Sequence, residues 1–141
     1  MITTLLIAMA ALQPSAWTWT LYEGDGPVVL AEEIPDTPRL RNTLECEPGS
    51  GVARVTLYRQ DARGGFVTLV AQDATTQSEA ETVSGGATPG VMAPVRLDHP
   101  VFAAFRARGS ITMRGAGGSW TLDMPLAELP KLRRFAELCA G

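Results

Sequence analysis

The sequence predicts a mainly β (α+β) fold, either a small antiparallel β-sandwich or a curled sheet of about seven or eight strands. Several short segments alternate between apolar and polar residues, which is the period of a half-buried strand. Turns rich in glycine and proline separate these segments. Two other segments have helical spacing, so a short helix is expected near 99–108 and a C-terminal helix near 127–139.

The first 16 residues resemble a secretory signal peptide. An apolar run over residues 2–12 is followed by a Gln-Pro break and two small residues. We therefore expect residues 1–16 to be removed and residues 17–141 to form a single β-rich domain in the periplasm or outside the cell. The alternative is that the apolar run is a buried element of the mature fold. The run is too short to cross a bilayer, so no stable membrane span is expected.

The segment WTWTLY, residues 17–22, is expected to be the first strand. Trp17 and Trp19 share a face with Leu21, which favours a core position for both indoles over an exposed stacking platform. The opposite, polar face is a candidate binding surface and carries Thr18, Thr20 and Tyr22. A second short strand is expected between two prolines, over residues 28–34.

The segment 39–58 predicts a β-hairpin across the turn PGSG. A four-residue loop in register places Leu44 opposite Val55 and Glu45 opposite Arg54, with Cys46 on the apolar face. The polar positions of this hairpin extend the candidate binding surface to Arg41 and Tyr58.

A strand over residues 66–72 is expected to pair with this hairpin as a three-stranded meander. Residues 73–94 are rich in small and polar residues, which predicts a long mobile loop with one polar edge strand near 79–83. A strand is expected again at PVRL, residues 94–97.

The C-terminal third contains both expected helices. Asp98 or His99 is expected to cap the first helix, with Pro100 in its first turn and Gly109 at its end. The segments SITMR and SWTLDM predict a hairpin across GAGG. The last helix has one apolar stripe, made of Leu129, Leu132, Phe135, Ala136 and Cys139.

The two cysteines are expected to form a disulfide. Cys46 and Cys139 lie on the apolar faces of two distant elements, in a chain that resembles an exported protein. The alternative is a pair of unconnected buried thiols in a cytosolic protein. A catalytic thiolate is disfavoured because the flanking Glu45 and Glu47 would raise the pKa of Cys46.

Composition argues against several functional classes. The net charge is -3 and the sequence pI is about 5.1, so nucleic acid is not an expected partner. Two cysteines and one histidine do not make a zinc site, and no other metal site or cofactor is expected. There is no G-x-S-x-G nucleophile elbow, and the GSG and GAGG segments are better explained as hairpin turns than as phosphate loops.

The order of features also resembles a known group of proteins. These features are a leader, an early aromatic strand, a Leu-Glu-Cys segment ahead of a hairpin, and a late strand that leads into a helix ending in cysteine, SWTLDMPLAELPKLRRFAELC. The plan is similar to small periplasmic proteins of Gram-negative bacteria such as the invasion associated locus B family. This resemblance implies a non-enzymatic exported module and identifies no active residue.

The sequence therefore favours an exported, disulfide-stabilised, non-enzymatic binding module for a protein or a cell-envelope component, with an inhibitor or immunity-type protein as a sub-case. The oligomeric state is left open. The alternative function is a small hydrolase that uses acidic residues, with Asp98 and His99 as the adjacent polar pair of interest.

Overall fold

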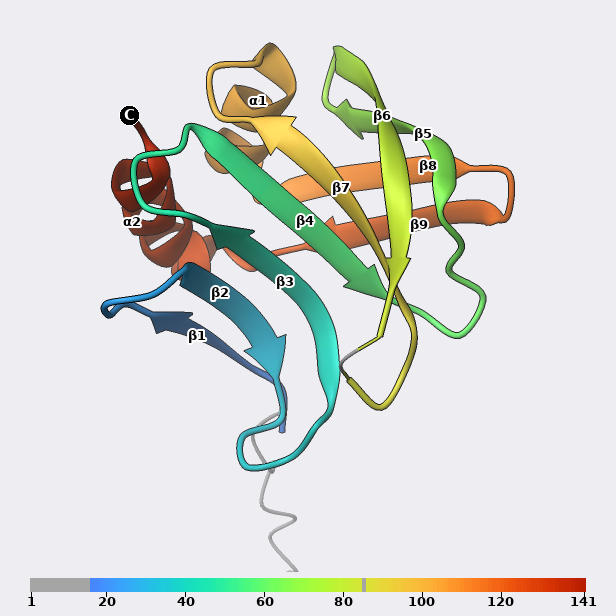
Figure 1. Cartoon of the computed structure of the whole chain (residues 1–141). Helices are drawn as coiled ribbons and strands as arrows, with labels where there is room; N and C mark the ends of the chain where they lie inside the picture. The colour runs from blue at the N-terminus through green and yellow to red at the C-terminus, as the bar shows by residue number, and fades with distance from the viewer. Residues whose placement is uncertain (1–15, 85) are drawn as a thin grey trace, which may run out of the picture.

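The protein is a curled antiparallel sheet with two helices on its inner side (Figure 1). The computed structural model describes residues 16–84 and 86–141. In this part of the chain nine strands form one sheet, in the order β1-β2-β3-β4-β7-β6-β5-β8-β9. The predicted mainly β fold is confirmed, and of the two expected arrangements the curled sheet is the one that forms. The expected signal peptide lies outside the described residues apart from Ala16.

The strands and helices follow the chain in a regular order. The strands are β1 (Thr18–Tyr22), β2 (Val28–Glu33), β3 (Leu40–Cys46), β4 (Val52–Tyr58), β5 (Gly65–Ala71), β6 (Ala74–Val83), β7 (Gly90–Arg96), β8 (Ser110–Gly115) and β9 (Gly118–Asp123). The helices are α1 (Pro100–Arg108), the short 3-10 turn η1 (Leu126–Glu128) and α2 (Leu129–Cys139).

The first four strands form an antiparallel meander whose register follows the apolar pattern. Leu44 lies opposite Val55 and Glu45 opposite Arg54, as the PGSG hairpin predicts. Leu44 and Val55 are fully buried, whereas Arg54 and Glu45 form an ion pair at 3.2 Å on the outer face. A shift of this register by one residue would exchange the two faces, so burial of the apolar set holds the pairing in place.

The expected meander of β3, β4 and β5 is wrong. β4 pairs with β7, and β5 pairs with β6 and β8. The β6–β7 pair therefore lies between β4 and β5, which is a Greek-key arrangement. The connection after β4 crosses this pair and is held at its far side, where the Trp120 indole donates to Asp61 at 3.1 Å.

The expected long polar loop over 73–94 is also wrong, because most of it is strand. β6 pairs with β5 over residues 74–80 and then with β7 over residues 81–83. Its polar composition reflects one exposed face, since exposed and partly buried residues alternate along most of the strand. Pro94 is tolerated inside β7 because it lies beyond the stretch from Gly90 to Met92 that pairs with β6, where its missing N–H is not needed. The Pro94 carbonyl accepts a hydrogen bond from Ser78 Oγ at 3.3 Å.

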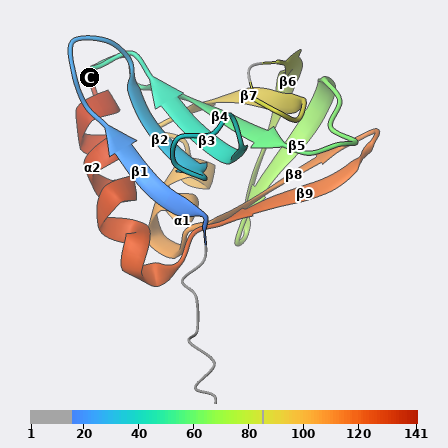
Figure 2. The ribbon, with the colours of Figure 1, turned by 90° about the horizontal axis from the view of Figure 1, so that it is seen from below.

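Both helices form where the sequence predicts them. The His99 Nδ1 accepts a hydrogen bond from the Val101 N–H at 3.0 Å, which caps α1, and Gly109 ends the helix with φ 78°. In α2 the expected stripe is buried, with Leu132 and Phe135 fully enclosed. α2 lies alongside β1 and β2 (Figure 2), and α1 contacts β5 and β6. Within the described residues, neither helix has the length and apolar character to span a bilayer.

A disulfide joins Cys46 in β3 to Cys139 at the end of α2, as the sequence predicts. The two Cα atoms are 5.9 Å apart and both side chains are fully buried. Two backbone hydrogen bonds accompany the link, from Gly49 N–H to the Leu138 carbonyl at 3.1 Å and from Gly51 N–H to the Cys139 carbonyl at 2.8 Å. The end of the chain is thereby fixed against the β3–β4 turn.

Two basic side chains bind the edge strands of the curled sheet. On β1 the Lys131 Nζ donates to the Trp19 carbonyl at 2.7 Å, and on β9 the Arg59 Nη2 donates to the Thr121 carbonyl at 3.1 Å. Lys131 comes from α2 and Arg59 follows the end of β4. Helix α2 therefore covers one edge, and a side chain from the middle of the sheet reaches the other.

Candidate functional site

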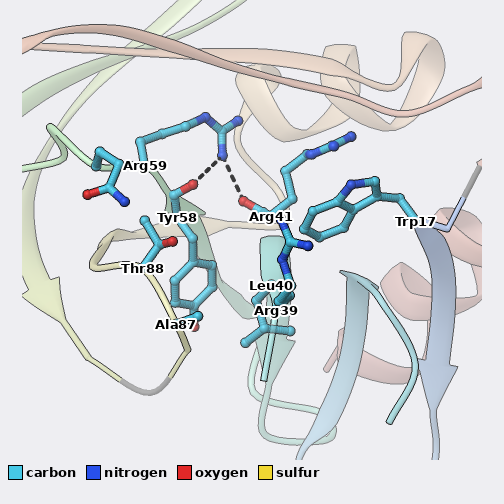
Figure 3. A pocket seen from close by; sticks show the side chains of 9 residues that line it. Trp17, Arg39, Leu40, Arg41, Tyr58, Arg59, Ala87 and Thr88 are labelled. Carbon is cyan, nitrogen blue, oxygen red and sulfur yellow. Dashed lines mark hydrogen bonds between the residues drawn. The ribbon is translucent and has the colours of Figure 1, made fainter. Parts of the chain in front are cut away.

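A hollow of about 350 Å³, here called the arginine pocket, lies where β3 begins and β4 ends (Figure 3). Its charged and aromatic lining consists of Arg39, Arg41, Arg59, Trp17 and Tyr58. The polar Gln60 and Thr88 and the apolar Leu40 and Ala87 complete the wall. Among the described residues no carboxylate lines this hollow, so three of the chain's positive charges face it without a lining acid.

Trp17 contacts two arginines, Arg41 within β3 and Arg39 just before this strand. The guanidinium carbon of Arg41 is 4.1 Å from the centre of the indole ring and that of Arg39 is 5.7 Å away. Both distances are within the range of cation–π attraction. The expected core position is confirmed for Trp19, which is 6% exposed, but is wrong for Trp17, which is half-buried in the pocket wall. Stacking uses the flat faces of a guanidinium, so its in-plane N–H groups remain available to an anion.

A buried chain of hydrogen bonds, here called the polar bridge, supports the pocket from beneath. Glu32 accepts from Arg41 Nη1 at 3.0 Å and from Asn42 Nδ2 at 2.7 Å. Asn42 Oδ1 accepts in turn from Arg59 Nη2 at 3.1 Å, and the same nitrogen reaches the Thr121 carbonyl. Glu32 is 8% exposed and Asn42 is 2% exposed, so these polar groups are satisfied by one another rather than by water.

The guanidinium of Arg59 is committed to the protein. Besides the polar bridge, its Nη1 donates to the Arg41 carbonyl at 2.7 Å and to the Tyr58 carbonyl at 2.9 Å (Figure 3). Burial lowers the pKa of Arg59, which nonetheless stays charged at neutral pH because an arginine titrates far above it. Arg59 therefore acts as a fixed positive charge at the back of the pocket.

Arg39 differs from the other two arginines. Its side chain is exposed, and within the described part of the chain its guanidinium has no hydrogen bond or ion pair. Arg41 uses Nη1 for Glu32, and its Nε and Nη2 have no partner among the described residues. The pocket thus presents guanidinium N–H groups of Arg39 and Arg41 that have no described acceptor. Both guanidinium groups lie over the Trp17 ring.

Tyr58 forms the opposite wall of the pocket from Trp17 (Figure 3). Burial raises the pKa of its phenol, so this side chain is neutral at physiological pH and can donate or accept a hydrogen bond. Its ring supplies apolar surface beside Leu40 and Ala87. The lining is accordingly mixed, with cationic donors beside aromatic and aliphatic surface.

The structure brings together only part of the predicted binding surface. Arg41 and Tyr58 line the arginine pocket. Thr18 and Arg41 line a second hollow of about 530 Å³ between β1 and the end of β9, on the other side of Trp17. Thr20 and Tyr22 line neither of these two hollows, and the Tyr22 hydroxyl donates to the Glu33 carboxylate on the neighbouring strand. That carboxylate raises the pKa of Tyr22.

Sequence reasoning missed Trp17, Arg39 and Arg59 as pocket residues. Alternation placed Trp17 on the same face as the buried Trp19, but Trp17 precedes β1, where the alternation of the strand no longer applies. Arg39 precedes β3 and Arg59 follows β4. A cluster of arginines near the ends of one hairpin, at positions 39, 41 and 59, was the available indication.

The structure gives Asp98 and His99 separate partners. Arg96 donates to both carboxylate oxygens of Asp98, at 2.9 and 2.7 Å, and lowers the pKa of this carboxyl. The His99 Nδ1 is occupied as the cap of α1. Each side chain is thus hydrogen-bonded to a group other than its neighbour, so the hydrolase alternative gains no support from this geometry.

Within residues 16–84 and 86–141, no group of three or more histidine, cysteine, aspartate or glutamate side chains is arranged to hold a metal ion. Comparisons with protein families, with characterised proteins and with solved structures found no match to this chain. The resemblance to the invasion associated locus B family gains no support from them.

Proposed function

We propose that this protein is an exported, non-enzymatic binding module that engages a protein or cell-envelope component through the arginine pocket. The observation that carries the proposal is the pocket itself, in which unused guanidinium donors from Arg39 and Arg41 face a cavity beside an aromatic wall. Ligand sites in proteins are concave, mixed in polarity and largely preformed. The polar bridge and the Trp17 stack give the pocket this preformed character.

The disulfide supports the location that we propose. A fully buried link between Cys46 and Cys139 fits a protein that folds in an oxidising compartment such as the periplasm or the exterior of the cell. Intact mass of the protein recovered from the producing cells tests this. We expect a chain that starts at Trp17 and takes up no alkylating reagent when denatured without reduction. A chain that keeps residues 1–16 and has two reactive thiols would contradict the location.

Binding through the pocket is tested by cross-linking from a defined position. A photoreactive amino acid replaces Ala87, an exposed residue of the pocket rim, and in a matched control it replaces Gln77, an exposed residue of β6. We expect a discrete adduct in the producing cells from position 87 and none from position 77. Equal adducts from both positions, or none from position 87 in a folded protein, would refute binding at this face.

The inhibitor or immunity-type role is a sub-case of this proposal. A small stable domain that acts by occlusion needs a rigid surface that does not rearrange on binding. The hydrogen-bonded polar bridge supplies that rigidity at the end of β3 that carries the pocket, and the disulfide fixes the opposite end of the same strand.

A further inference from the structure

The arginine pocket has the donors of an anion site that the chain itself leaves incomplete. Arg59 is fully engaged with carbonyl groups and Asn42, and Arg41 gives one nitrogen to Glu32. Arg39 is stacked near Trp17 but gives none of its N–H groups to a described acceptor. Because Glu32 offsets one of the three positive charges, a net positive charge remains at the pocket.

We infer that the arginine pocket binds the carboxylate side chain of an acidic segment on a partner protein. This inference rests on the proposed function and names the chemistry of its ligand. Arg39 is the principal donor, with the free edge of Arg41 as the second. A guanidinium stacked on an indole presents its N–H groups in one plane, which matches the two oxygens of a carboxylate.

The rest of the lining fits the stem of an acidic side chain. Leu40, Ala87 and the ring of Tyr58 supply apolar surface to the lining beside the guanidinium groups. An aspartate or glutamate offers both parts, an aliphatic stem and a planar charged end. The cavity, at about 350 Å³, lies at the small end of ligand sites, which suits one or two side chains rather than a large organic ligand.

The charge of the whole chain favours a protein partner over a membrane. The chain has a net charge of -3 and a single lysine, so an anionic lipid surface would repel most of it. Attraction is confined to the pocket and is screened beyond about 10 Å at moderate salt. An acidic segment can insert one side chain into the pocket, where the attraction is. A flat, phosphate-rich surface would also face the rest of the protein, whose negative charge repels it.

The test uses the full oxidised protein and a short, end-blocked peptide with adjacent glutamates, with the glutamine peptide as its counterpart. The readout is the indole N–H signal of Trp17 in a nuclear magnetic resonance titration, assigned with Trp17→Phe; the chain has three tryptophans, and the other two are buried. The variants are Arg39→Gln and, as a matched control, Arg133→Gln, which removes the same charge from an exposed position of α2. Circular dichroism and thermal unfolding check that both variants are folded.

We expect the glutamate peptide to shift the Trp17 signal in a saturable way and the glutamine peptide to leave it unchanged. Arg39→Gln should weaken the binding by about tenfold or more, and Arg133→Gln should change it less than twofold. Equal shifts with both peptides, equal effects of the two variants, or a stronger response to inorganic phosphate or to phosphatidylglycerol vesicles would overturn the inference. A cross-link from position 87 without any response to glutamate would refute the carboxylate chemistry alone. A response to glutamate without that cross-link would refute the macromolecular partner alone.

Discussion

Removal of the disulfide is expected to destabilise the protein without preventing it from folding. Cys46 and Cys139 are separated by 93 positions in the sequence. In the chain-entropy model, a cross-link that closes a loop of this length stabilises the folded state by about 4.6 kcal/mol, because the unfolded chain loses conformational freedom. Replacement of both residues by alanine should therefore lower the free energy of unfolding by about that amount, with a further small loss for the missing sulfur atoms.

Non-covalent contacts should keep α2 docked in this variant. Leu132 and Phe135 are fully buried against the sheet, and the hydrogen bonds from Gly49 and Gly51 to the end of the helix do not need the sulfur atoms. A loss of about 4.6 kcal/mol is large beside the roughly 5 to 15 kcal/mol that stabilises a typical domain. We therefore expect a folded variant whose melting temperature is lower by about 15 °C.

Urea unfolding followed by circular dichroism measures the effect in three samples: the oxidised protein, the same protein reduced in denaturant and refolded, and the Cys46→Ala/Cys139→Ala variant. The reduced protein keeps both sulfur atoms, so it isolates the effect of the cross-link from that of packing. The slope of the unfolding free energy against urea should rise in both samples without the disulfide, because their unfolded chains are more extended.

Two results would refute this reasoning. A loss of less than about 1 kcal/mol in both samples would show that the cross-link does not restrict the unfolded chain as the loop length requires. An unchanged denaturant slope together with a large loss in the alanine variant alone would place the effect in core packing instead.

Three further predictions concern the polar bridge, a helix end and an ion pair. Asn42→Ala should lower the free energy of unfolding by about 3 kcal/mol in urea titrations, because it leaves Glu32 short of a buried donor. Gly109→Ala should cost about 2 kcal/mol in the same assay, since the residue has φ 78° and a Cβ there would lie 2.7 Å from a neighbouring carbonyl oxygen. The Asp98 carboxyl should titrate below its ordinary pKa in carbon-detected magnetic resonance, and Arg96→Gln should raise that value. Because the folded-state pKa of Asp98 is lowered, this pair favours the folded state above the ordinary aspartate pKa and ceases to do so as the pH falls through the folded value.

Each of these predictions has a result that would contradict it, and the first also has a control. Gln60→Ala, at an exposed position, should leave stability unchanged, and an equal loss in both alanine variants would argue against a structural role for the bridge. Gly109→Ala with wild-type stability would show that the end of α1 relaxes without strain. An Asp98 titration that does not respond to loss of Arg96 would contradict the ion pair as the cause of the shift.

The elements that could be predicted are those in which local periodicity and burial agree. The hairpin over 39–58 and the stripe of α2 each place one apolar face against the core, so the sequence determined the register of the hairpin and the pairing of the cysteines. Helix α1 was predicted from its caps rather than from its periodicity, because His99 and Gly109 define its two ends.

The elements that could not be predicted depend on long-range packing. β6 has a polar pattern because one of its faces is exposed, and the strand expected to start at Pro94 in fact begins at Gly90. In the structure β6 pairs with β5 over residues 74–80 and with β7 over residues 81–83, so it changes its partner partway along its length. Only part of the candidate site could be predicted, because alternation gives information on residues within strands and not on those beside them. Arg41 lies within a strand, where alternation applies, whereas Trp17 and Arg59 lie just outside strands.

The basic side chains that bind the two edge strands also bear on self-association. A curled sheet that does not close has two edges, and an unpaired edge is a template for strand addition by another copy of the chain. Lys131 occupies the Trp19 carbonyl on one edge, and Arg59 occupies the Thr121 carbonyl on the other. Each places a charge where an incoming strand would have to form its hydrogen bonds. Arg59, which fixes the back of the arginine pocket, therefore also occupies an acceptor that strand addition at β9 would need.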